Sequence, residues 1–171
     1  MSEIATVTVE LTNLDILGAV VLSMDGVLLG VGRHNLYESC VDGWGFKLRE
    51  YYYPFIICEG GKRIVTDEDN LRKNPDLIDQ IKGEYALQVA EAEANNLGYV
   101  HERIAEGVKV YFPNAAEVLI RADGRVEGFG FNGVGCDAAR RVFSEALGTI
   151  ADVVLKDEYF RETVKLSEKE G

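Results

Sequence analysis

The stretch "NPDLIDQIKGEYALQVAEAEANNLG" (residues 74–98) has the clearest helical pattern in the sequence. Pro75 follows Asn74 at a first-turn position, where proline is favoured because its missing N–H is not needed. The segment from Asn96 to Gly98 supplies the stop signal. Apolar side chains recur at helical spacing and form one stripe: Leu77, Ile81, Tyr85, Val89 and Ala92. The pattern predicts a long helix that buries one face.

The sequence before this helix is strand-like. The segment "ATVTVEL" (5–11) alternates and is rich in β-branched residues, which favours a strand. Residues 27–66 contain no good helical pattern, hold many of the aromatic residues and are punctuated by glycines. Gly60-Gly61 is typical of a two-residue hairpin turn, so we expect paired strands in "YPFIICE" and "KRIVTD" on either side of it.

Two shorter segments connect these strands to one another and to the helix. Residues 12–24 carry a threonine followed three positions later by an aspartate, which favours a capped helix over the rival interpretation, a hairpin turning at Asp25-Gly26. The segment "DEDN" (67–70) is interpreted as a solvated loop. Its carboxylates lack the spacing of an EF-hand, which disfavours a calcium site at Asp67, Glu68 and Asp69.

A second compact pattern follows the long helix. Residues 99–112 predict a hairpin or strand pair, and Pro113-Asn114 predicts a domain boundary. Beyond it, two strands flank Asp123-Gly124, which is a strong type I′ turn signal. A glycine-rich loop, a helix and a short last strand complete this part of the chain.

The 171 residues are 47% hydrophobic and 27% charged, which is ordinary for a globular protein. We expect an α+β fold with two small sheet-and-helix lobes and mainly antiparallel strands. The N-terminal domain is predicted over residues 1–113. The C-terminal domain, residues 114–171, is predicted to be ββαβ with a frayed tail.

Charge and composition make several functions unlikely for this sequence. A net charge of −11 disfavours nucleic-acid binding, because Lys and Arg provide most of that affinity. Three widely spaced cysteines indicate no disulfide framework, and with only two histidines we expect no metal site and no cofactor. The apolar run "LDILGAVVL" (14–22) is too short to span a bilayer, so we expect a cytoplasmic protein with no membrane partner.

The C-terminal pattern resembles a small bacterial family of unknown function. Its members share a D-G hairpin, then G-x-x-G-x-x-C at the start of a helix, then an L-G stop and an acidic, aromatic end. The matching positions here are Asp123, Gly124, Gly130, Gly133, Cys136, Leu147 and Gly148.

The N-terminal part, residues 1–112, resembles the plastid and cyanobacterial open-reading-frame family thirty-five. The likeness rests on a first strand and helix, a glycine- and aromatic-rich strand region, and a helix like "GEYALQVAEAEANNLGY". The two families are often encoded side by side near AAA-type ATPases. The resemblance therefore implies a fusion of both families. It also implies an accessory or adaptor protein that binds itself or a protein partner, for which an AAA-type ATPase is the candidate. No catalytic residue carries over from either family.

An aromatic cluster in the strand region is the candidate partner-binding site: Trp44, Tyr51, Tyr52, Tyr53 and Phe55. Aromatic residues are enriched at the centres of protein interfaces, although the core of a twisted sheet is the alternative interpretation. If the tyrosines lie on a strand, Tyr52 faces opposite to Tyr51 and Tyr53, so aromatics occupy both faces.

Two weaker candidates concern small ligands or anions. Arg33 and His34 are adjacent and offer cationic groups, and an aromatic pocket between the lobes is the alternative to protein binding. Cys136 follows Gly133 and Gly135 where a helix is predicted to begin, and a helix N-terminus stabilises a thiolate or an anion. Because no histidine is near in sequence to act as a base, we favour a packing role for this cysteine.

Overall fold

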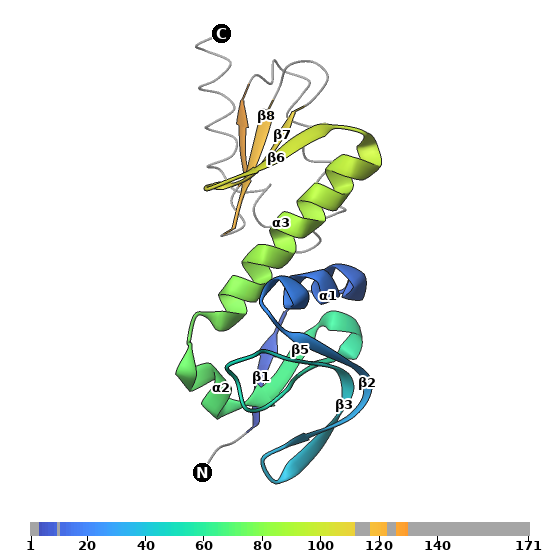
Figure 1. Cartoon of the computed structure of the whole chain (residues 1–171), viewed down its shortest axis with the longest axis vertical. Coiled ribbons are helices and arrows are strands. Elements are labelled where there is room, and N and C mark those ends of the chain that lie inside the picture. Colours follow the sequence, from blue (N-terminus) through green and yellow to red (C-terminus); the bar gives the residue numbers. More distant parts are fainter. Residues whose placement is uncertain (1–3, 10, 112–116, 123–125, 130–171) are drawn as a thin grey trace. The chain divides into compact units, whose positions relative to one another are not determined.

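The structure is a computed structural model that describes residues 4–9, 11–111, 117–122 and 126–129 (Figure 1). The fold is α+β, as the sequence predicts, with helices and two antiparallel sheets. The described elements are β1 (Ile4–Thr8), α1 (Leu14–Ser23), β2 (Val27–Leu36), β3 (Ser39–Lys47), β4 (Phe55–Cys58), the 3-10 turn η1 (Glu59–Gly61), β5 (Arg63–Asp67), α2 (Glu68–Lys73), α3 (Leu77–Leu97), β6 (Val100–Ile104), β7 (Gly107–Tyr111), β8 (Glu117–Arg121) and β9 (Val126–Phe129).

The chain divides into two compact units, Met1–Tyr85 and Ala86–Gly171. This division differs from the predicted boundary at Pro113-Asn114. The physical reason is strand pairing, because β7 and β8 lie on either side of that dipeptide and pair with each other in one sheet. The predicted boundary therefore falls inside a sheet, while the division falls within α3.

The first unit is built on a five-stranded antiparallel sheet in the order β1-β5-β4-β3-β2. Phe46 of β3 lies opposite Phe55 of β4, and their rings stack with centroids 5.2 Å apart at 9°. Both rings are fully buried. Side chains alternate along a strand, so this pair determines which residues of the neighbouring strands face the core.

Helix α1 covers the face of the sheet that carries the two phenylalanines. Gly18 of α1 lies against the side chains of Leu28 and Trp44. Asn13 caps the helix by accepting a hydrogen bond from the Ile16 N–H at 3.2 Å. The prediction of a helix over 12–24 is confirmed, but the cap is one residue later than the threonine that the sequence suggested. The core side chains of α1 are Leu17, Val20 and Val21.

The β4–β5 hairpin is confirmed, with a longer connection than the predicted two-residue turn. Cys58 pairs with Arg63, so four residues, 59–62, join the strands. Gly60 and Gly61 both have positive φ, at 66° and 99°. Gly61 also accepts a hydrogen bond from Leu11 N–H at 2.8 Å, which ties the segment after β1 to this turn.

The prediction of a solvated loop over 67–70 is wrong. Asp67 ends β5 and is 1% exposed, and its Oδ1 caps α2 by accepting a hydrogen bond from Asp69 N–H at 3.1 Å. Asn70 is 3% exposed and donates to Thr66 Oγ1 and to the Tyr53 carbonyl, at 2.9 and 2.8 Å. The polar composition misled the prediction because Asn70 and Asp67 are buried, with hydrogen-bond partners for Asn70 Nδ2 and Asp67 Oδ1 and none for Asp67 Oδ2 among the described residues.

Helix α3 confirms the long helix predicted from 74–98, but it begins at Leu77 because Pro75 lies in the turn before it. Its apolar stripe is buried except at its last member, Ala92, which is half-buried. Tyr85 accepts a hydrogen bond from Asn13 N–H at 3.0 Å, which joins α3 to the start of α1. Gly98, with φ 72°, ends the helix as predicted.

The second unit contains a four-stranded antiparallel sheet in the order β6-β7-β8-β9. The strand pair predicted over 99–112 is confirmed as β6 and β7. The first two strands predicted for the ββαβ lobe are confirmed as β8 and β9. The turn residues 123–125 between them lie outside the described residues, as do the glycine loop, the predicted helix and the last strand.

The two glycines of η1 provide a matched pair of substitutions. A Cβ at Gly60 meets nothing within 4 Å, whereas a Cβ at Gly61 would lie 2.4 Å from the Leu11 carbonyl oxygen. We expect Gly60→Ala to lower the free energy of unfolding by about 1 kcal/mol, through backbone strain alone. Gly61→Ala should lower it by about 3 kcal/mol or more, because backbone must also move. Urea unfolding of both variants measures the difference, and equal losses would contradict this account of the turn.

Candidate functional site

Strand β2 forms an exposed edge of the first sheet. It is ten residues long, pairs with β3 on one side, and is the last strand in the order of the sheet. Four of its apolar side chains are exposed: Val27 at 60%, Leu28 at 41%, Leu29 at 45% and Val31 at 85%. Exposed aliphatic side chains on an edge strand are a typical surface for pairing with another chain.

A β-bulge at Leu29 and a set of glycines shape this edge. The pairing of β2 with β3 shifts by one residue between Leu28 and Gly30, and Gly30 has φ 78°. Beyond the bulge, Gly30 pairs with Gly45 and Gly32 pairs with Gly43. The missing side chains leave space over the sheet face that is turned away from the phenylalanine pair.

His34 fills that space. Its Nε2 lies 3.0 Å from the Gly30 carbonyl oxygen and 3.1 Å from the Gly43 carbonyl oxygen. Because both partners are acceptors, Nε2 carries the proton and donates to them. The ring would lie 2.6 Å from a Cβ at Gly45, so glycine is required there. The His34 side chain therefore stabilises the bulged part of β2 against β3 through these two hydrogen bonds.

The anion site predicted at Arg33 and His34 does not assemble. The two residues are neighbours on β2, so their side chains point to opposite faces of the sheet. Arg33 Nε donates to Asp42 Oδ1 at 3.3 Å, and both side chains are more than 70% exposed. His34 uses Nε2 for the backbone contacts described above. The other residues predicted to bind a ligand, Gly133, Gly135 and Cys136, lie outside the described residues.

The five predicted partner-binding aromatics fall into two groups. Phe55 is fully buried, and a row of ring contacts joins it to Phe46 and Trp44 on one side and to Tyr51 on the other. Trp44, Tyr51 and Tyr53 are half-buried. Tyr52 is the exception among the five, at 81% exposed. Four of the five side chains are thus partly or wholly used in packing.

The three tyrosines lie in the connection between β3 and β4, so the prediction that they alternate along a strand is wrong. Tyr53 packs against a small apolar cluster of Leu36, Ile56 and Val65. Tyr52 turns outward, and the Lys47 Nζ lies 5.9 Å from the centroid of its ring. Lys47 pairs with Val27, which places Tyr52 close to the first residues of β2.

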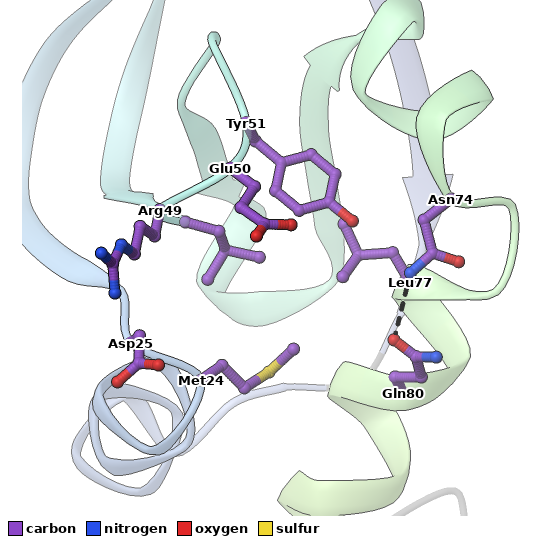
Figure 2. Close-up of a pocket in the computed structure, with 9 residues that line it drawn as sticks. Met24, Asp25, Arg49, Glu50, Tyr51, Asn74, Leu77 and Gln80 are labelled. Carbon is purple, nitrogen blue, oxygen red and sulfur yellow. Dashed lines mark hydrogen bonds between the residues drawn. The ribbon is translucent and has the colours of Figure 1, made fainter.

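A cleft of about 320 Å³ lies beside Tyr51 within the first unit (Figure 2). Its buried floor includes Leu48 and Leu77. Figure 2 shows polar side chains on both sides of the Tyr51 ring. Asn74 and Gln80 lie on one side, and Asp25 and Arg49 lie on the other. The Asn74 Nδ2 donates to Gln80 Oε1 at 3.2 Å. The remaining lining residues are Met24 and Glu50.

The described cysteines occupy different environments. Cys40 of β3 is exposed, and its Sγ lies 3.0 Å from Asn35 Oδ1. Cys58 of β4 is half-buried, and burial, assisted by the carboxylate of Glu59, raises the pKa of its thiol. Within the described ranges, no group of three His, Cys, Asp or Glu side chains is placed to hold a metal ion. None of the described helices is long and apolar enough to cross a membrane.

Comparison with known proteins gives no match of this chain to a family model, a curated protein or a solved structure. The site therefore rests on its own geometry.

Sequence reasoning missed the β2 edge as a candidate site. The signal was present in "VLLGV" (27–31), an apolar run that lacks the polar alternation of a half-exposed strand. The same run is also compatible with a buried central strand, and periodicity does not distinguish the two. Strand order decides between them, and it depends on pairings that are distant in sequence.

The two cysteines should differ in their rate of alkylation. At pH 8 we expect iodoacetamide to modify Cys58 about an order of magnitude more slowly than Cys40, because Cys58 is less accessible and its pKa is raised. The rate at Cys58 should still increase at pH values where an ordinary thiol is fully ionised. Peptide mass spectrometry of the intact protein after timed labelling measures both rates. Equal rates at the two sites would contradict the described environment of Cys58.

Proposed function

We propose that this chain is a non-catalytic accessory protein that acts by binding another protein, and that β2 and Tyr52 form the binding surface. The observation that supports the proposal is the row of exposed aliphatic side chains on β2, from Val27 to Val31. Tyr52 lies beside Lys47, which pairs with Val27, so it adds an exposed aromatic ring near the first residue of β2, and aromatic residues are frequent at interface centres.

The edge of a sheet suits this role because its outward N–H and C=O groups can pair with an extended segment of a partner. Such strand addition gains affinity from backbone hydrogen bonds and specificity from alternate side chains. Natural proteins usually protect long edges with charges, prolines or β-bulges, and β2 has a bulge at Leu29. In β2 the charged residue is Arg33, and the first six residues, 27–32, carry no charge. No charged side chain in this part of the edge therefore opposes pairing with a partner strand.

The families that the sequence resembles extend the proposal to a class of partner. Their members are often encoded near AAA-type ATPases, which makes such an ATPase a specific protein to test. A net charge of −11 also favours a partner with a basic surface, through electrostatic steering.

Substitution at Val31 tests the binding surface. Val31→Lys places a charge at the most exposed aliphatic position of β2, and we expect it to reduce capture of partner proteins from a native lysate at least tenfold. Val100→Lys is the matched control, because Val100 is 70% exposed on β6, an edge of the other sheet. Quantitative mass spectrometry compares the captured proteins. Equal capture by Val31→Lys and the unsubstituted chain would contradict the proposed surface.

A second candidate function is binding of a small molecule or anion in the cleft beside Tyr51. The supporting observation is its combination of an apolar floor, an aromatic ring and charged groups at the rim, where Arg49 lies among the carboxylates of Asp25 and Glu50. If it binds anions, nucleotides or inorganic phosphate should raise the melting temperature, and Arg49→Ala should remove that increase. Arg63→Ala serves as the control, because Arg63 does not line the cleft. Thermal melting that no anion alters would count against this alternative.

A further inference from the structure

We propose that a second copy of this chain pairs antiparallel with β2, so that two first sheets join edge to edge. The inference rests on the proposed function, because it assigns the occupant of the same surface. It goes further by naming that occupant and the orientation in which it binds.

The length and openness of β2 support the pairing. With ten residues it is twice as long as β1, the five-residue strand at the other edge of this sheet. Val31 is 85% exposed, although its partner Trp44 lies on the face that α1 covers. A partner strand alongside β2 would bury Val31 and continue the same face.

The charges at the two ends of β2 specify the orientation. Asp25 stands just before the strand and Arg33 lies towards its end, with no charged residue between them. In an antiparallel pair the Arg33 end of one copy meets the Asp25 end of the other, twice by symmetry. In a parallel pair like charges would meet. Opposite charges on neighbouring strands are stabilising, whereas like charges are destabilising.

The bulge is compatible with a two-fold axis beside Gly30. Leu28 and Val31 face the same side of the sheet, because their partners Phe46 and Trp44 are two residues apart on β3. An axis between Leu29 and Gly30 places Val31 of each copy opposite Leu28 of the other, so that both become buried. The uncharged run also lets two chains of net charge −11 approach where repulsion is least.

Arg33 is accessible to a second copy, because its side chain is 73% exposed although its Nε donates to Asp42. Its guanidinium has further N–H groups that can donate to a carboxylate of the second copy.

Sedimentation equilibrium of the full chain tests the pairing. We expect a monomer–dimer equilibrium whose dissociation constant increases at least tenfold in Val31→Lys and is unchanged in Val100→Lys. Arg33→Glu and Asp25→Lys should each weaken the dimer, and the double variant Asp25→Lys/Arg33→Glu should recover affinity. Urea unfolding of every variant at low concentration separates loss of pairing from loss of folding.

Three results would overturn the inference. They are a monomer at all concentrations up to about 1 mM, a dimer that Val31→Lys leaves intact, and charge reversals whose effects simply add. If the chain is monomeric while Val31→Lys still loses a captured partner, the second copy is excluded and the proposed function stands. If Val31→Lys changes neither self-association nor capture of a partner, both the pairing of two copies and the proposed function are contradicted.

Discussion

The stacked pair of Phe46 and Phe55 is the contact on which the first unit depends. It fixes the register of β3 against β4 and determines which face of the sheet becomes the core. Through strand alternation it also assigns Trp44 and Leu28 to the side that α1 covers. His34 crosses the opposite face, where its ring leaves no room for a side chain at position 45, while Ile56 and the Ile57 carbonyl crowd position 43.

The exposed surface of β2 follows from this arrangement. Trp44 on β3 is half-buried beneath α1, but Val31 next to it on β2 is almost fully exposed. The edge strand thus extends Val31 beyond the part of the sheet that α1 covers. Burying aliphatic surface is favourable by about 25 cal/mol for each square ångström removed from water. A partner that covers β2 would be stabilised by this burial.

Local signals in the sequence predicted most of the described elements. The helix α3, its stop at Gly98 and the hairpins around η1 and between β6 and β7 follow from periodicity and turn chemistry. The errors concern tertiary contacts. The acidic segment after β5 becomes a helix because Asp67 and Asn70 find buried partners, and sequence composition carries no sign of those partners.

The candidate site was only partly predictable for the same reason. The aromatic cluster was recognised, but burial separates Tyr52 from Phe55, and the ring contacts that cause it come from strand register. The apolar run of β2 was visible, whereas its place at the edge was not. Strand order arises from pairings between distant segments, and no local pattern in a single sequence specifies it.

Hydrogen exchange of the β2 amides tests the central claim most directly, because it reports whether the open edge acquires a partner strand. We expect outward-facing amides of Val27–Leu36 to exchange quickly in dilute protein and to become protected as the concentration rises, while amides of the edge strand β6 do not change. Protection of β2 that is independent of concentration and unaffected by any bound protein would contradict the account.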